Sequence, residues 1–246
     1  MSRVIVLTIF VLLSLTGVSV SVATEETHWD YEGQEGPENW GALAGDYDIC
    51  ARGRNQSPID LVADFHSELP KLELDYTHLG IEEINTGHAI QEKVKRGNFV
   101  TFLGVRYELN QFHFHSPSEH TVKGKTFPME VHLVHQSEDG MYLVIGLMFR
   151  EGKTNDLMNQ FPSFRKERGE DPYGDPINYN DLVTERGDYF LYNGSLTTPP
   201  CTEGVQWIVI KQPVIASREQ IQHYHDLLGF DNNRPIQPHH SRVVVD

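Results

Sequence analysis

The residues best suited to chemistry in this chain are histidines spaced two apart within a β-rich stretch. The stretch Leu109 to His115 reads Leu-Asn-Gln-Phe-His-Phe-His. Because a strand sends alternate side chains to opposite faces, Gln111, His113 and His115 share one face and the two phenylalanines take the other. Two imidazoles on one face can hold a metal ion, but such a pair needs a third ligand.

A second β-rich stretch supplies candidates for that ligand. In Glu130 to His135, the same alternation puts His132 and the glutamate on one face and the second histidine, His135, on the other, so either histidine but not both can complete the set. Three neutral imidazoles around Zn²⁺ leave the fourth tetrahedral position to water, which is the arrangement of a catalytic site. Gln111 and Glu130 each lie two residues before a candidate ligand, where they can accept a hydrogen bond from its outer nitrogen.

These residues need a sheet to position them, and the chain is rich in strand patterns. Short apolar runs between turn residues predict strands over Phe99 to Leu103, Tyr107 to His115, Met129 to His135, Met141 to Phe149 and Val205 to Ile210. Helical patterns are scarce and cover Asn155 to Gln160 and Ser217 to Leu228, the latter with a capping-box pattern at Ser217 and Gln220 and a stop at Gly229. The Gly- and Pro-rich segment Glu167 to Asn180 predicts a surface loop, and no linker indicates a second domain.

Several motifs, in this order along the chain, resemble those of the alpha carbonic anhydrase family. They are Gln111-Phe112-His113-Phe114-His115, Ser118-Glu119-His120, Glu130-Val131-His132-Leu133-Val134-His135 and Ser195-Leu196-Thr197-Thr198-Pro199-Pro200. Further matches are His28-Trp29-Asp30-Tyr31, Asn55-Gln56-Ser57-Pro58-Ile59-Asp60, Gly87-His88-Ala89, Trp207 and Asn233-Arg234-Pro235, so the resemblance covers nearly the whole chain after its N-terminal segment. It implies a mainly β (β-rich α+β) single domain with a central, mostly antiparallel, twisted sheet of about ten strands, short peripheral helices and a conical active-site cleft.

The resemblance also implies the metal site and the reaction. It makes His113, His115 and His132 the ligands of one Zn²⁺ per chain, and it leaves His135 on the opposite face. The implied reaction is the reversible hydration of carbon dioxide to bicarbonate and a proton, through attack by zinc-bound hydroxide. A catalytically silent binding domain and a zinc esterase are the alternatives, but silent relatives lack a ligand histidine and all three are present here.

By the same resemblance, Thr197 accepts a hydrogen bond from the hydroxide and donates its own proton to Glu119. His88 shuttles protons to buffer, a role that suits histidine because its unperturbed pKa of about 6.5 allows gain and loss of a proton near neutrality. Three residues would hold the water chain between them: Tyr31, Thr86 and Gln91. His120 is assigned to orienting the local backbone or a carboxylate and not to the metal.

The remaining implied positions surround the substrate. Asn233 joins Gln111 and Glu130 as an outer support of the ligands. An apolar pocket wall beside the metal would consist of Val134, Val144, Leu196, Thr198 and Trp207, since a small, weakly polar substrate needs mainly a dry pocket. The resemblance further implies inhibition by sulfonamides and anions, and it is compatible with a homodimer.

The N-terminus predicts export. Met1-Ser2-Arg3 precedes an apolar run from Val4 to Val20 and the small-residue stretch Ser21-Val22-Ala23, which is the pattern of a signal peptide over residues 1–23. The run falls short of the roughly 20 apolar residues of a membrane helix, so we expect cleavage and a secreted or periplasmic domain over 24–246, with an uncleaved anchor as the alternative.

Cysteine content and charge agree with this compartment. The only two cysteines, Cys50 and Cys201, would meet an oxidising environment and are predicted to form one disulfide. The chain carries 35 acidic and 20 basic residues, a net charge of −15. Such a surface repels phosphate backbones and anionic lipids, which argues against nucleic acid as a partner.

Overall fold

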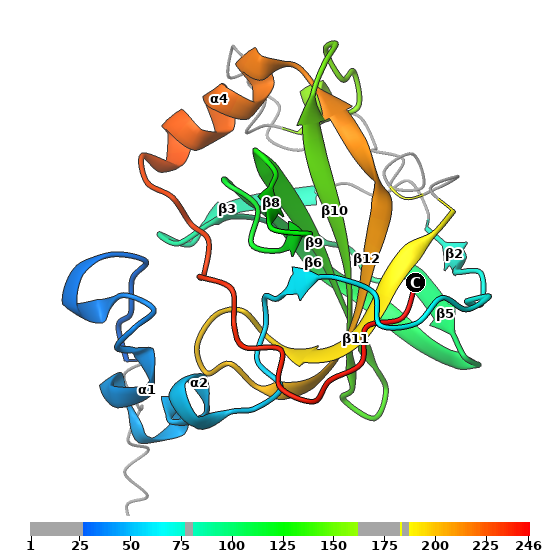
Figure 1. Ribbon diagram of the computed structural model, residues 1–246. Helices are drawn as coiled ribbons and strands as arrows, with labels where there is room; N and C mark the ends of the chain where they lie inside the picture. Colours follow the sequence, from blue (N-terminus) through cyan, green and yellow to red (C-terminus); the bar gives the residue numbers. More distant parts are fainter. Residues whose placement is uncertain (1–26, 77–80, 162–182, 184–186) are drawn as a thin grey trace, which may run out of the picture.

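The computed structural model describes residues 27–76, 81–161, 183 and 187–246 (Figure 1). The predicted signal peptide and the predicted loop Glu167 to Asn180 lie outside these residues. Among the described residues, no helix has both the length and the apolar character required to cross a membrane.

A twisted sheet of nine strands dominates the described part of the chain (Figure 1). Its strands are β2 (Glu73–Asp75), β3 (Ile81–Asn85), β4 (Ile90–Val94), β5 (Phe99–Phe102), β6 (Val105–His115), β9 (Met129–Ser137), β10 (Tyr142–Glu151), β11 (Tyr189–Ser195) and β12 (Glu203–Ala216). The strand order is β11-β12-β10-β9-β6-β4-β3, and β5 pairs with both β6 and β2. The β-rich class and the predicted central strands are therefore confirmed.

One feature departs from an antiparallel sheet. Within this nine-stranded sheet, all neighbouring strands are antiparallel except β10 and β12, which run parallel. The chain leaves β10, forms β11 and returns through β12, which lies between β10 and β11. A parallel pair needs such a long connection, and strand patterns alone do not reveal which neighbour a returning strand will join.

The small elements were only partly predicted. A separate sheet joins β1 (Asp60–Leu61), β7 (Thr121–Val122) and β8 (Lys125–Thr126), and four short helical turns precede it: η1 (Gly33–Glu35), α1 (Trp40–Leu43), η2 (Gly45–Tyr47) and α2 (Ile49–Arg52). The helix predicted over 155–160 is limited to one turn, η3 (Met158–Gln160).

The C-terminal helix α4 (Arg218–Leu228) follows its sequence signals. The Ser217 side chain accepts a hydrogen bond from the Gln220 N–H, and the Gln220 side chain accepts one from the Ser217 N–H. The helix ends at Gly229, whose φ of 81° suits a residue without Cβ. Both predicted ends of this helix are therefore confirmed.

The two faces of the sheet bury different cores. Phe112, Phe114, Val131 and Leu133 enter the larger cluster, to which α4 also contributes side chains. The opposite face carries a smaller cluster that includes Val134, Val144, Tyr192 and Trp207. His113 and His115 alternate with Phe112 and Phe114 along β6, and His132 alternates with Val131 and Leu133 along β9. These three histidines therefore lie on the side of the smaller cluster.

Candidate metal centre

Strand register brings the three histidines together. His113 on β6 pairs directly with His132 on β9, and His115 lies two residues further along β6 on the same face. One nitrogen from each imidazole lies within 4.8 Å of the others. His115 and His132 are buried, whereas His113 is half-buried and reaches the floor of a cleft.

Each of these imidazoles has an acceptor at its outer nitrogen. His113 Nδ1 lies 2.8 Å from Gln111 Oε1, His115 Nδ1 lies 2.6 Å from the backbone oxygen of Asn232, and His132 Nε2 lies 2.9 Å from Glu130 Oε1. An acceptor at the outer nitrogen places the ring proton there and leaves a lone pair on the inner nitrogen. His115 Nε2, one of these inner nitrogens, is buried and has no hydrogen-bond partner in the described part of the chain. This donor set fits a tetrahedral zinc site with an open fourth position.

The support predicted at Asn233 lies one residue earlier. The Asn232 carbonyl accepts from His115, and its side chain bonds to the Ser116 N–H and the Phe114 carbonyl. Asn233 is half-buried and lines a separate hollow beside Tyr31. Because a backbone carbonyl is present at every residue, the sequence held no signal for this contact.

His135, the alternative third ligand, lies in the larger core. Its Nε2 is 2.6 Å from the hydroxyl of Tyr76 and its Nδ1 is 3.2 Å from the carbonyl of Leu143. Burial lowers the pKa of His135 to about 4. Strand parity thus separates it from the group formed by the other three histidines.

The pKa values of the three candidate ligand imidazoles are shifted in different directions. Burial, followed by the neighbouring histidines, holds the pKa of His113 well below its usual value, and burial also lowers the pKa of His115. Burial alone would lower the pKa of His132, but the Glu130 carboxylate outweighs it and raises that pKa. Burial opposes ionisation of Glu130, yet His120 and His132 hold its pKa well below the usual range. A permanent carboxylate therefore stands behind His132.

Glu119 lies on the inner side of the three histidines. Its Oε1 accepts the Arg234 N–H at 2.8 Å, and its Oε2 lies 3.5 Å from His115 Nε2 and 3.7 Å from His132 Nδ1. This Oε2 is buried and has no hydrogen-bond partner among the described residues. The expected hydrogen bond from Thr197 to Glu119 is not formed in this part of the structure, because the free oxygen faces the two imidazoles.

A cleft of about 700 Å³ opens above the histidines. His113 and His115 lie at its floor, and it is lined further by predicted site residues: Tyr31, Thr86, His88, Gln91, Gln111 and Thr198. The cleft therefore brings the residues of the predicted proton path and two of the candidate metal ligands into one space.

The predicted apolar wall lies beside His132, the third candidate ligand. Val134, Val144 and Trp207 are cross-strand neighbours on β9, β10 and β12. The ring of Trp207 lies 4.8 Å from the ring of His132, and Leu196 packs against the same cluster. The register of three strands thus assembles residues that are far apart in the sequence.

His88 is held at the mouth of the cleft. Its ring stacks on Trp29 at 3.7 Å, and its Nε2 donates to the Trp29 carbonyl at 2.8 Å. The hydroxyl oxygen of Thr86 accepts the N–H groups of His88 and Ala89, which fixes the turn that carries the imidazole. Thr86 therefore positions this histidine directly.

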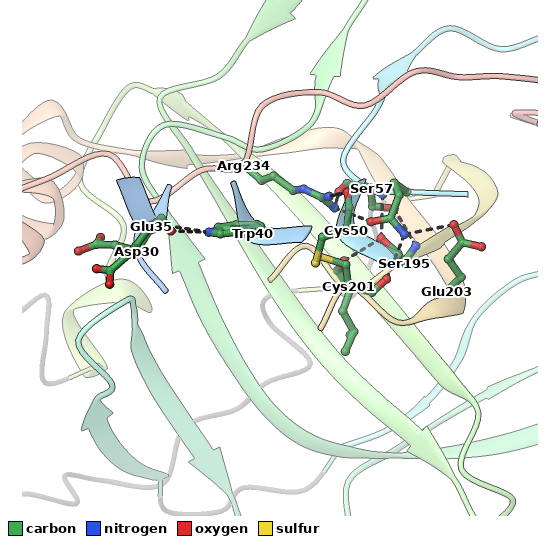
Figure 2. Close-up of a disulfide and its surroundings, with 11 residues drawn as sticks. Asp30, Glu35, Trp40, Cys50, Ser57, Ser195, Cys201, Glu203 and Arg234 are labelled. Atoms are coloured by element: carbon green, nitrogen blue, oxygen red, sulfur yellow. Dashed lines mark hydrogen bonds between the residues drawn. A yellow bond between two sulfur atoms is a disulfide. The ribbon is translucent and has the colours of Figure 1, made fainter. Parts of the chain in front are cut away.

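The predicted disulfide between Cys50 and Cys201 is present (Figure 2). The carbonyl of Cys50 accepts from Arg234 Nη2 at 2.9 Å, and the carbonyl of Cys201 accepts from Gln56 Nε2 at 3.0 Å. In Figure 2 the Arg234 side chain extends past Trp40 toward Cys50. Since the Arg234 N–H also binds Glu119, this buried arginine connects the disulfide region to the site.

Two further residues complete the surroundings of Glu130. His120 Nδ1 lies 2.8 Å from Glu130 Oε1, and His120 Nε2 lies 2.6 Å from the hydroxyl of Tyr192. His120, Glu130 and His132 also lie close enough together to hold a metal ion, but Glu130 already accepts a hydrogen bond from His120 and forms an ion pair with His132. The assignment of His120 to a carboxylate agrees with this geometry, whereas no sequence pattern indicated the contact with Tyr192.

The fold and the site together define a class of protein: a β-sheet protein with three supported histidines at the base of a cleft. The model of the family described as eukaryotic-type carbonic anhydrase matches residues 35–246. A carbonic anhydrase of Neisseria gonorrhoeae is 38% identical over 245 residues, covering 98% of this chain and 96% of that protein. One from Klebsiella pneumoniae is 41% identical over 239 residues, covering 96% of each.

Solved structures agree. The alpha carbonic anhydrase of Thermovibrio ammonificans, in complex with the inhibitor sulfanilamide, is 41% identical with a TM-score of 0.84, covering 90% of this chain and 100% of that one. A hyperthermostable carbonic anhydrase from a hydrothermal vent chimney is 42% identical with a TM-score of 0.82, covering 89% of this chain and 99% of that one. This chain therefore belongs to the alpha class of the carbonic anhydrase family of enzymes.

Proposed function

We propose that this chain catalyses the reversible hydration of carbon dioxide at one zinc ion held by His113, His115 and His132. The observation that carries the proposal is that one nitrogen from each of the three imidazoles lies within 4.8 Å of the others, and that each ring has an oxygen of a neighbouring group at its outer nitrogen. Zinc bound by three imidazoles lowers the pKa of a coordinated water toward neutrality, an effect for which carbonic anhydrases are themselves the standard example.

The chain's own residues preset the ligand geometry. Gln111 and the Asn232 carbonyl accept the outer protons of His113 and His115, so these two rings are held in the tautomer that directs the lone pair inward. The Glu130 carboxylate lies 2.9 Å from the outer nitrogen of His132 as an ion-pair partner. Less reorganisation is then needed when the metal binds.

Thr197 and Glu119 would orient the reacting oxygen. A hydroxyl has one proton, so if Thr197 donates to the Glu119 carboxylate, its oxygen is left as an acceptor facing the cleft. This bond is not formed in the described part of the structure, but the buried Oε2 of Glu119 has no hydrogen-bond partner there and is available to accept it. The Arg234 N–H holds the other oxygen of the same carboxylate.

The substrate would lie against the apolar wall. Carbon dioxide gains little from hydrogen bonds, and Val134, Val144, Leu196 and Trp207 offer a surface with little water beside His132. Thr198, which lines the cleft, supplies a polar edge.

Protons would leave by way of His88. The imidazole lines the same cleft as His113 and lies half-exposed at its mouth, where buffer can reach it. Tyr31, Thr86 and Gln91 line the space between and would order the intervening water. General acid–base transfer of this kind requires a group that both takes and gives a proton near neutral pH.

We also propose that the enzyme works outside the cytoplasm, as a single domain over 24–246 after removal of residues 1–23. The apolar N-terminal pattern and the disulfide support this location. Sulfonamides and small anions are the inhibitors expected at the metal, and the sulfanilamide complex of the Thermovibrio ammonificans enzyme supports the former.

The test is stopped-flow carbon dioxide hydration with zinc quantified on the same samples. The wild-type chain should carry one zinc and hydrate carbon dioxide rapidly, and His132→Ala should lose both properties. His135→Gln is the matched control, because it changes a buried histidine on the same strand that faces the other core, and it should keep its zinc. Zinc binding without hydration above the buffer rate would overturn the enzyme proposal in favour of a binding domain.

A further inference from the structure

A chain of buried polar contacts leads away from the proposed metal ligand His132, beginning with an ion pair and continuing as hydrogen bonds. Its members are Glu130, His120, Tyr192 and Ser57, none of which is more than 2% exposed. Glu130 Oε1 contacts both His132 and His120, His120 contacts the hydroxyl of Tyr192, and that hydroxyl lies 2.8 Å from Ser57 Oγ. This network of contacts connects four parts of the polypeptide, namely β9, the segment after β6, β11 and the segment before β1.

The proton positions along this chain follow from what each group can donate. The Glu130 carboxylate only accepts, so His120 Nδ1 must carry the proton that faces it. A neutral His120 then presents a lone pair at Nε2, and the hydroxyl of Tyr192 donates to it. Burial raises the pKa of Tyr192 well above its usual value, so the phenol keeps its proton.

Ser57 supports this direction. Its oxygen accepts the Ser195 N–H at 3.1 Å, and its own proton can go to the oxygen of Tyr192. All groups are then satisfied. In the reverse direction Tyr192 would donate to Ser57, and the Ser57 proton would have no acceptor among its partners in the described part of the chain.

Glu130 connects this hydrogen-bond network to the proposed metal site. Its Oε2 accepts the N–H groups of Glu119 and His120, and its Oε1 faces the imidazoles of His120 and His132. Rotation of the His120 ring would remove one of these four contacts and leave the carboxylate free to shift away from His132. The His120 ring also lies edge-on to Trp207 at 4.8 Å, so packing and the two hydrogen bonds together set its orientation.

We propose that Tyr192 is a positioning residue of the metal centre: its hydroxyl fixes the ring orientation of His120, which in turn holds Glu130 against His132 and slows release of the metal. This inference rests on the proposed zinc site. Tyr192 touches neither the metal ligands nor the cleft, so its effect is transmitted through two hydrogen bonds.

Gly194 allows the close packing of Ser57, Tyr192 and Trp207 around this network. A Cβ at this position would collide with Ser57 Oγ and lie 2.8 Å from Cε2 of Tyr192 and 2.9 Å from Cδ1 of Trp207. The close approach of β11 to these groups therefore requires glycine, although Gly194 lies in a strand with an ordinary backbone conformation.

The test compares zinc release from three zinc-loaded variants into excess chelator. Tyr192→Phe should release zinc about tenfold faster than wild type, the low end of the effect of outer partners on metal affinity. Tyr189→Phe is the matched control, because it removes a hydroxyl on the same strand that binds the Pro70 carbonyl away from the site, and its rate should stay unchanged. Ser57→Ala should also release zinc at the wild-type rate, because Tyr192 can still donate to His120 without it.

Nitrogen-15 NMR of the histidine rings supplies a second readout that does not depend on zinc release. In wild-type protein, with or without zinc, His120 should carry its proton on Nδ1, and Tyr192→Phe should shift the Nε2 resonance because that nitrogen loses its hydrogen bond. A proton on Nε2 of wild-type His120, or equal zinc release from Tyr192→Phe and Tyr189→Phe, would overturn the proposal. Absence of zinc from wild-type protein would instead refute the proposed metal site itself.

Discussion

Replacement of Glu92 by glutamine should make the protein more stable at neutral pH. Glu92 lies on β4 directly opposite Glu83 on β3, and its side chain is fully buried. Burial first, and then the charge and hydrogen bond of Glu83, raise the pKa of Glu92 to about 9. In the unfolded chain the same carboxyl group has an ordinary pKa, near 4.5.

The sign follows from proton linkage. Below pH 4.5 both states hold the proton and Glu92 imposes no pH-dependent cost. Between pH 4.5 and 9 the folded state keeps a proton that the unfolded state has lost, so the free energy of unfolding falls by about 1.4 kcal/mol for each pH unit. At pH 7 the accumulated loss is about 3 kcal/mol.

Glutamine has a similar shape and does not titrate, so Glu92→Gln removes this loss. Urea unfolding at pH 5 and pH 7 measures it as the difference in unfolding free energy between variant and wild type. That difference should grow by about 3 kcal/mol from the lower to the higher pH. Comparison of the two proteins at each pH cancels titration of the histidines common to both.

Glu82→Gln is the control, since it removes an exposed carboxylate from the same hairpin. Its stability difference from wild type should not vary with pH. If Glu92→Gln also shows a difference independent of pH, Glu92 titrates alike in both states and the reasoning from burial is wrong. A difference that shrinks as pH rises would show that the folded state favours the ionised carboxylate.

Two further predictions concern the cleft and the disulfide. His88→Ala should slow hydration in dilute buffer, keep its zinc and regain its rate in concentrated imidazole buffer, whereas a defect that imidazole does not relieve would place His88 outside the proton path. Joint replacement of Cys50 and Cys201 by serine should lower the free energy of unfolding by up to about 5 kcal/mol, because the disulfide closes a loop spanning 151 residues. Urea unfolding measures this loss, and a loss below about 1 kcal/mol would contradict the loop-entropy argument.

The identification of the site depended on local regularity in the chain. Alternation along β6 was sufficient to place Gln111, His113 and His115 on one face, and alternation along β9 did the same for Glu130 and His132. The hydrogen bond of Gln111 to His113 follows from that spacing. Patterns of this kind can be read from a sequence because each depends on residues only a few positions apart.

The choice between His132 and His135 could not be made from spacing alone. It depends on which face of β9 lies over the histidines of β6, and the pairing of His113 with His132 decides it. The resemblance to the family supplied that choice at the sequence level. The hydrogen bond of His135 to Tyr76, 59 residues away, gives the physical reason for the opposite orientation.

Contacts between distant segments account for what was missed. The Asn232 carbonyl reaches His115 across 117 residues, Tyr192 reaches His120 across 72, and β12 enters the sheet beside β10. The sequence by itself determined the strands, the faces of their histidines, the caps of α4 and the pairing of its only two cysteines. Only the tertiary structure decided strand order, the orientation of Glu119 and the backbone groups that hold the ligands, because these depend on the closure of long loops and not on neighbouring side chains.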